Sequence, residues 1–155
     1  MPGYSGTPLP KKLGIKPGFR AQLLNALPEV LAELSVALSE CEILKRGAAL
    51  DFVMLFSKSR EELAREFSRL AKVLVPAGML WVSWPKKSSG VPSDLDESLV
   101  REIGLRAGLV DVKVCAVTEI WSGLKFVRRL KDRPRTIAPK TIGPKKLVPA
   151  SRKNK

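Results

Sequence analysis

The chain has 155 residues, the length of one domain, with 45% hydrophobic residues and a formal net charge of +13 from 28 Lys and Arg against 15 Asp and Glu. It has no histidine, which excludes Ser-His-Asp and Cys-His catalysis and imidazole metal ligands, and its two cysteines are too few for a zinc site. We therefore expect no metal and no recognisable catalytic residue. We also expect free thiols at Cys41 and Cys115 in a cytoplasmic protein. No apolar stretch is long enough to predict a membrane span.

The first third of the chain predicts an arm followed by a strand, a helix and a weak strand. Residues 1–18 are rich in Pro and Gly and form the N-terminal arm. Residues 19–25 are typical of a strand. Residues 28–38 predict a short amphipathic helix, because apolar residues recur at helical spacing and Pro28 suits a first turn. Residues 41–44 predict the weak second strand.

The middle of the chain predicts two strands separated by a longer helix. Residues 51–56 are continuously apolar, as in parallel strands that are buried on both faces. Ser59 and Glu62 have capping-box spacing at the start of a helix over 60–75, in which the serine accepts an orphan amide and the glutamate reaches back. A Pro-Ala-Gly triplet is expected to end this helix, and 79–84 is the next buried strand.

The remaining elements are a polar loop, a helix and a closing hairpin. The loop covers 85–92, and the helix covers 94–107 with Gly108 as its C-cap. Residues 110–118 and 124–130 predict an antiparallel pair. Acidic residues begin the helix and match its dipole; they are Asp94, Asp96 and Glu97.

Alternation of strands and helices up to a final hairpin predicts a three-layer, Rossmann-like α/β fold with about six strands. Its sheet is expected to be mostly parallel, with the closing hairpin antiparallel. This domain covers residues 19–131. Residues 132–155 combine prolines with lysines and arginines, and we expect a disordered basic tail.

Two resemblances support this fold class. The segment 70–83 resembles the helix, Leu-x-Pro-Gly-Gly, strand signature of class I S-adenosylmethionine (SAM)-dependent methyltransferases, and 13–20 resembles the approach to their first strand. This resemblance implies a truncated sheet with the order 2-1-3-4-6-5 in chain numbering and the sixth strand antiparallel. Over residues 1 to 133 the chain also resembles a small bacterial family of domains of unknown function, which implies no activity. The blocks that carry this second resemblance are 3–14, 81–90, 108–117 and 121–125.

The departures from methyltransferases concern the cofactor. The resemblance implies a glycine-rich turn after the first strand, but residues 25–28 read Asn-Ala-Leu-Pro. It implies an acid after the second strand, where Lys45 and Arg46 stand. One strand–helix unit is missing before Asp51, which we expect to be structural. We therefore predict no cofactor bound in the usual manner and keep SAM as an alternative.

Ligands of open α/β sheets bind beyond the carboxyl ends of the strands. That edge carries basic and hydroxyl side chains that could hold an anion; the competing interpretation is a solvated basic loop. Of the tryptophans, Trp81 is expected in the core, whereas Trp84 and Trp121 at element ends could be half-exposed. The candidate residues at the ligand edge are Asn25, Ser57, Lys58, Trp84, Lys86, Lys87, Ser88, Ser89 and Gly90.

The basic tail suggests a polyanion partner such as nucleic acid, since neutralised phosphates give salt-dependent affinity. A solubilising tail explains the same composition equally well. The candidate contacts are Lys131, Arg133, Arg135, Lys140, Lys145, Lys146, Arg152 and Lys153.

The sequence thus favours a non-catalytic Rossmann-like binding or regulatory module that contacts nucleic acid or another polyanion through its tail. The alternative is an atypical SAM-dependent methyltransferase or another transferase with a nucleotide-like ligand. A third interpretation is a subunit that pairs through an uncovered sheet edge at 41–44.

Overall fold

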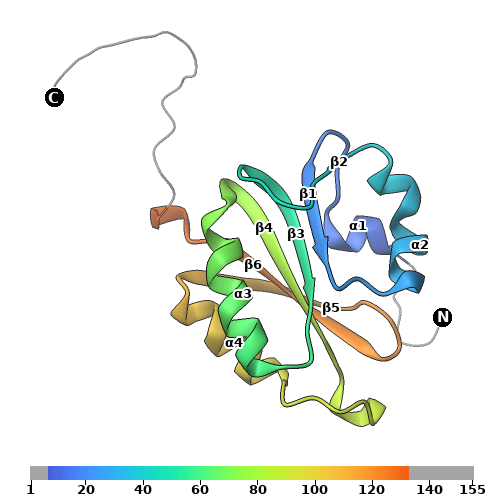
Figure 1. Ribbon diagram of the computed structural model, residues 1–155, viewed down its shortest axis with the longest axis vertical. Coiled ribbons are helices and arrows are strands. Elements are labelled where there is room, and N and C mark those ends of the chain that lie inside the picture. The colour runs from blue at the N-terminus through green and yellow to red at the C-terminus, as the bar shows by residue number, and fades with distance from the viewer. Residues whose placement is uncertain (1–6, 133–155) are drawn as a thin grey trace, which may run out of the picture.

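The computed structural model describes residues 7–132 and contains one six-stranded sheet with the order β2-β1-β3-β4-β6-β5 (Figure 1). β1 pairs in parallel with β2 and β3, β3 with β4, and β6 runs antiparallel to both β4 and β5. The predicted fold class and strand order are confirmed. The strands are β1 Arg20–Leu24, β2 Glu42–Ile43, β3 Leu50–Phe56, β4 Leu74–Pro85, β5 Leu109–Ala116 and β6 Trp121–Arg128.

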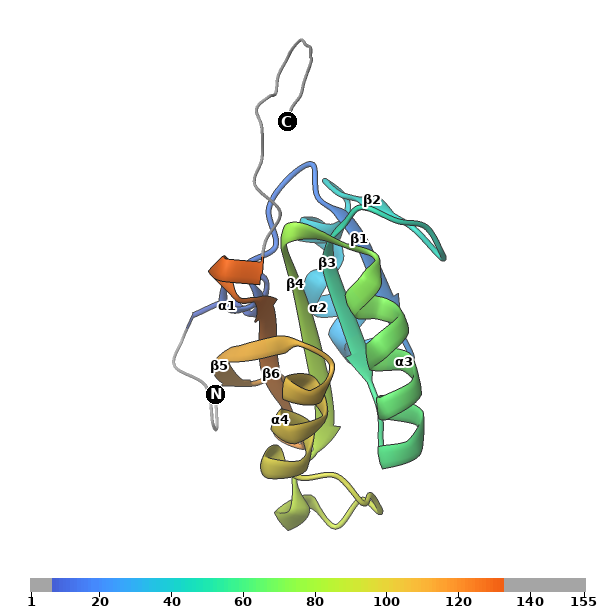
Figure 2. The ribbon, with the colours of Figure 1, turned by 90° about the vertical axis from the view of Figure 1, so that its left-hand side faces the viewer.

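Helices cover both faces of the sheet (Figure 2). One layer holds α3 and α4, whose buried residues pack on one face, and the other holds α1 and α2 on the opposite face. Among the described residues no helix combines the length and hydrophobicity needed to traverse a bilayer. The helices are α1 Leu9–Leu13, α2 Pro28–Leu38, α3 Arg60–Lys72 and α4 Glu97–Arg106, with short 3-10 turns at Lys87–Ser89 and Leu130–Asp132.

The core under α3 and α4 is closed by aromatic packing against a glycine. Phe67 of α3 meets Phe126 of β6 edge to face, with ring centroids 5.0 Å apart, and both side chains are fully buried. Gly104 of α4 lies against the Phe126 ring so closely that an added Cβ would stand 2.1 Å from Cε1. α4 therefore approaches the sheet at a distance that only glycine permits.

The opposite core holds the described part of the N-terminal arm. Leu9 and Leu13 of α1 are buried, and the Trp81 indole nitrogen donates to the Leu13 carbonyl oxygen at 2.9 Å. Trp81 itself is fully buried, as expected. The hydrogen bond joins residues 68 positions apart and holds α1 on the sheet.

The boundary between α3 and β4 differs from the prediction. α3 ends at Lys72 and β4 begins at Leu74, so Pro76-Ala77-Gly78 lies inside the strand and does not end the helix. The Val73 carbonyl accepts the Leu50 amide at 2.9 Å, which starts the β3–β4 pairing early. A Cβ at Gly78 would stand 2.8 Å from the Leu50 carbonyl oxygen, so β4 needs glycine there.

The start of α4 also differs. The helix begins at Glu97 rather than residue 94, because Asp96 is its N-cap and accepts the Leu99 amide at 2.8 Å. This hydrogen bond, with Lys87 3.6 Å away, lowers the pKa of Asp96. Asp94 instead accepts the Arg60 amide at the start of α3. Gly108 has φ +94°, as the predicted C-terminal cap requires.

Candidate functional site

The ligand edge of the sheet lies where β1 and β3 end. β1 leads into α2 on one face and β3 leads into α3 on the other, so the chain leaves the two strands in opposite directions. Such a topological switch point separates the following loops and leaves a crevice for a ligand. Asn25 directly follows β1, and Ser57 directly follows β3.

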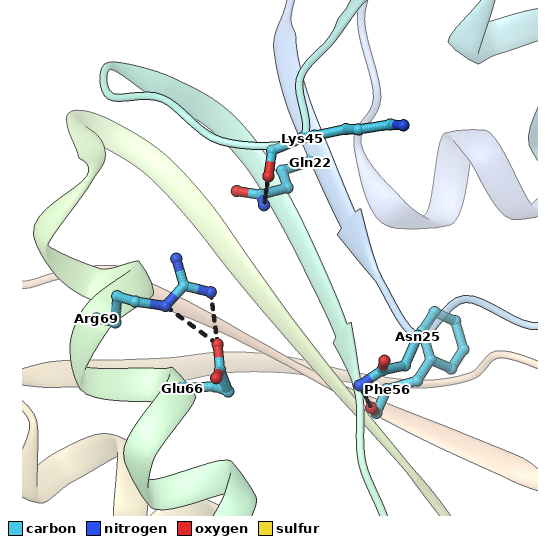
Figure 3. A network of polar contacts seen from close by, with 6 residues as sticks. All are labelled: Gln22, Asn25, Lys45, Phe56, Glu66 and Arg69. Atoms are coloured by element: carbon cyan, nitrogen blue, oxygen red, sulfur yellow. Dashed lines mark hydrogen bonds and ion pairs between the residues drawn. The ribbon is translucent and has the colours of Figure 1, made fainter.

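Asn25 adopts the left-handed conformation, with φ +59°. Asparagine tolerates this region better than other side chains except glycine. Its Nδ2 donates to the Phe56 carbonyl oxygen at 3.2 Å, which ties the β1–α2 turn to the end of β3 (Figure 3). The sequence contains no glycine in this turn, yet the turn has the backbone conformation for which glycine is usually required.

Two cavities flank Asn25. One, of about 290 Å³, lies toward β3 and carries most of the polar side chains. The other, of about 450 Å³, lies toward β2 and is lined mainly by leucines and Ile43. The lining residues of the smaller cavity are Asn25, Leu27, Phe56, Ser57, Lys58, Ser59, Glu62 and Trp121.

The polar groups of the smaller cavity are held in place by the start of α3. The Ser59 hydroxyl accepts the Glu62 amide at 3.2 Å, which confirms the predicted serine cap. The capping box also predicts that Glu62 reaches back to the Ser59 amide, and this part of the prediction is wrong. The Glu62 carboxylate accepts the Ser57 hydroxyl at 3.0 Å, while Ser57 Oγ accepts the Ser59 amide. Glu62 is thereby positioned beside the cavity.

Trp121 forms an aromatic wall of the smaller cavity. It pairs with Pro85 at the start of β6, so the antiparallel strand brings it back to the carboxyl end of β4. Its ring meets Phe56 edge to face at 5.6 Å and is 7% exposed, which corrects the expectation of a half-exposed ring. The predicted edge residues omitted Trp121, Phe56, Ser59 and Glu62; the antiparallel hairpin was the signal that could have placed Trp121 there.

The larger cavity exists because β2 is short. β2 pairs only with Arg20 and Ala21, so the carboxyl half of β1 pairs with β3 on one side and has no strand on the other. The chain after β2 turns back, and the Gln22 side chain donates to the Lys45 carbonyl oxygen at 2.7 Å (Figure 3). Lys45 lines the cavity where methyltransferases are expected to have an acid, and the exposed Ile43 marks the predicted open edge.

The predicted loop after β4 does not join these cavities. Trp84 is 4% exposed and lies in the core beneath α3 and α4, which corrects its assignment to the ligand edge. Lys86 donates its amide to the Ile120 carbonyl, and Lys87 pairs with Asp96 at 3.6 Å. The remaining candidates form a 3-10 turn that ends in the left-handed conformation; they are Ser88, Ser89 and Gly90.

The predicted tail contacts fall almost entirely beyond the described residues. Lys131 is exposed in the last 3-10 turn. The other tail candidates lie outside residues 7–132; they are Arg133, Arg135, Lys140, Lys145, Lys146, Arg152 and Lys153.

The left-handed backbone conformation at Asn25 restricts which side chains fit there without strain. We expect Asn25→Val to lower the free energy of unfolding by about 1–2 kcal/mol, because a β-branched residue is strained in the left-handed region. Asn25→Gly is the matched control and should stay within about 1 kcal/mol of the parent, since glycine relieves strain while losing one hydrogen bond. Urea unfolding measures both, and equal losses would contradict the assigned turn.

No family model and no curated protein sequence matches this chain. Solved structures do match it. Magnesium protoporphyrin IX methyltransferase from Synechocystis PCC 6803, solved with bound SAM, superimposes with a TM-score of 0.53 at 12% identity, covering 78% of this chain and 74% of that one. A SAM-dependent methyltransferase from Aquifex aeolicus gives 0.53 at 16% identity, covering 75% and 85%.

A third match is to the complex of the Haloferax volcanii Trm112 methyltransferase activator with the putative methyltransferase. Its TM-score is 0.58 at 10% identity, with 77% of this chain and 86% of that chain covered. At identities this low, the superpositions establish a shared architecture and give no evidence of a shared activity. The chain has the fold of class I SAM-dependent methyltransferases.

Proposed function

We propose that this chain is an atypical SAM-dependent transferase that holds its cofactor across Asn25. The observation that carries the proposal is that Asn25, in a left-handed turn at the switch point, lines both a polar and an apolar cavity. SAM has a zwitterionic amino-acid end and an aromatic base at its other end, so it needs two such environments side by side.

The polar cavity suits the amino-acid end of the cofactor. Lys58 offers a cation for the carboxylate, and Glu62 offers a carboxylate for the ammonium group. The indole of Trp121 offers a π-system to a sulfonium cation. These three side chains would bind and orient the cofactor, which itself supplies the methyl group.

The apolar cavity suits the adenine. Leucine side chains and Ile43 line it, and Gln22 stands at its wall. Lys45 in place of a carboxylate leaves the ribose hydroxyls without an anionic acceptor. Because a hydrogen bond to a charged group contributes about 1.5–3 kcal/mol, we expect an affinity lower than that of enzymes with the acid.

Calorimetry with SAM and S-adenosylhomocysteine on the full chain tests this function. We expect binding, and we expect Lys58→Gln to weaken it by about two- to fivefold, since the lysine is exposed and its ion pair correspondingly modest. Lys72→Gln makes the same charge change at the far end of α3 and should leave the affinity unchanged. Absence of binding at millimolar concentrations of both ligands would contradict the proposal.

The charge distribution supports a second candidate, a module that binds a polyanion through its tail. Residues 125–155 hold twelve basic residues and one acid, Asp132. This function requires no cofactor. Salt-dependent binding of nucleic acid, together with no detectable binding of SAM, would favour this function over the transferase.

A further inference from the structure

A separate group of lysines gathers where α1 meets the edge strand β5. These lysines come from stretches 7–19, 112–118 and 121–129, none of which contains Asp or Glu. α1 and β5 lie on the same side of the molecule in Figure 2. The group, here called the lysine face, consists of Lys11, Lys12, Lys16, Lys113 and Lys125.

The two strands of the lysine face place like charges opposite each other. Lys113 of β5 and Lys125 of β6 are directly paired in the sheet register. Like charges in such a pair are destabilising unless something compensates them. Burial, together with Lys113 and Lys16 nearby, lowers the pKa of Lys125. The repulsion between Lys113 and Lys125 therefore lowers the stability of the fold, and an anion bound nearby would reduce this repulsion.

Backbone carbonyls fix two of these lysines. The Lys113 ammonium donates to the Lys12 carbonyl oxygen at 2.9 Å, and the Lys12 ammonium donates to the Ala116 carbonyl oxygen at 3.3 Å. Each contact joins residues about a hundred positions apart along the chain, so tertiary structure alone creates it. Lysines held in this way lose less side-chain entropy when they bind a ligand.

A cavity of about 460 Å³ opens between these elements. Three lysines and Thr7 line it, and none of its lining residues is acidic. Cys115 is also in its wall; burial raises the pKa of this thiol, while Lys12 and Lys113 act to lower it. The lining residues are Thr7, Lys11, Lys12, Lys113, Val114, Cys115 and Ala116.

We propose that the cavity of the lysine face is a binding site for the phosphate groups of a ligand. Three lysines and a threonine in the lining, with no acidic residue among them, suit an anion that carries more than one charge. This cavity shares no lining residue with the two cavities at Asn25. Phosphate binding at this cavity therefore does not depend on binding of the proposed cofactor.

Alkylation of the unmodified full chain tests the site directly. The chain has two cysteines, and only Cys115 lines the cavity. We expect tripolyphosphate to slow the reaction of Cys115 with iodoacetamide several-fold, because a bound anion blocks the thiol and disfavours its thiolate. Cys41, followed in the same peptide digest, should react at an unchanged rate. Unchanged alkylation of Cys115 would overturn the proposal.

Paired lysine variants provide the second test. Lys11→Gln with Lys113→Gln should weaken tripolyphosphate binding roughly tenfold. Arg65→Gln with Lys72→Gln removes the same charge from exposed positions of α3 and should have no effect. Both pairs retain the basic tail, so a contribution of the tail cancels in the comparison. Equal effects of the two pairs would refute a specific site.

The source of the phosphate is distinguished by repeating the alkylation with a single-stranded oligonucleotide. Protection of Cys115 by the oligonucleotide as well would support a nucleic-acid backbone as ligand. In that case the slope of log binding constant against log salt concentration should decrease in magnitude by about two in the Lys11→Gln and Lys113→Gln double variant. Protection by tripolyphosphate alone would support a small phosphorylated ligand. Protection by neither would overturn the site, whatever the outcome with SAM.

Discussion

Gly104→Ala is expected to destabilise the protein by about 2 kcal/mol or more, although alanine is the better helix former by about 1 kcal/mol. The added methyl group would stand 2.1 Å from Cε1 and 2.6 Å from Cδ1 of Phe126. The ring has little room to move, because it is fully buried and its edge contacts Phe67. α4 would have to move away from the sheet and lose packing along its length.

Thermal and urea unfolding measure this effect, and a loss of about 2 kcal/mol lowers the melting temperature by roughly 4–8 °C in a chain of this size. Ser98→Ala, an exposed change on the same helix, should stay within about 0.5 kcal/mol of the parent. Phe126→Leu in the Gly104→Ala background should show favourable coupling in a double-mutant cycle, because the ring that clashes is gone. Additive effects would contradict the contact.

Leu13→Ala is the second large effect we expect, with a loss of about 2–5 kcal/mol on unfolding in urea. Leu13 is fully buried in the core under α1, and its carbonyl accepts the Trp81 indole nitrogen at 2.9 Å. Truncation leaves a cavity beside Trp81 and weakens the attachment of α1. Part of the lysine face is on α1, so the same substitution should also weaken tripolyphosphate binding.

Leu130→Ala is the matched control for Leu13→Ala. Leu130 is 77% exposed in the last 3-10 turn, and its removal should change the unfolding free energy by less than about 0.5 kcal/mol. Tryptophan fluorescence of the Leu13→Ala variant should shift to the red as Trp81 gains water. A Leu13→Ala variant as stable as the Leu130→Ala variant would show that α1 does not contribute to the core.

Local chemistry was sufficient for most of the fold. The continuous apolar run at β3 predicts a central parallel strand, and Pro28 marks the first turn of α2, which runs from Pro28 to Leu38 as expected. These elements depend on residues near one another in sequence, which is why a single sequence reveals them. The strand order, in contrast, was implied by the resemblance to methyltransferases, and the structure has that order.

The site was predicted only in part for the same reason. Asn25, Ser57 and Lys58 follow strand ends and were placed at one edge by topology alone, and they do line one cavity. The position of Trp84 at the end of a strand predicts the same edge, but its side chain is buried in the core. Strand position indicates which edge a residue is near, while the packing of the helices decides which face its side chain occupies.

The amino-acid sequence was sufficient for the class of fold, the lack of histidine chemistry and the uneven distribution of charge. Tertiary structure alone decided that Asn25 takes a left-handed turn, that Gly104 must be glycine against Phe126, and that Lys12 and Lys113 meet across α1 and β5. The physical reason is distance along the chain. Contacts between residues tens to about a hundred positions apart form only when the whole sheet has assembled, and no local pattern encodes them.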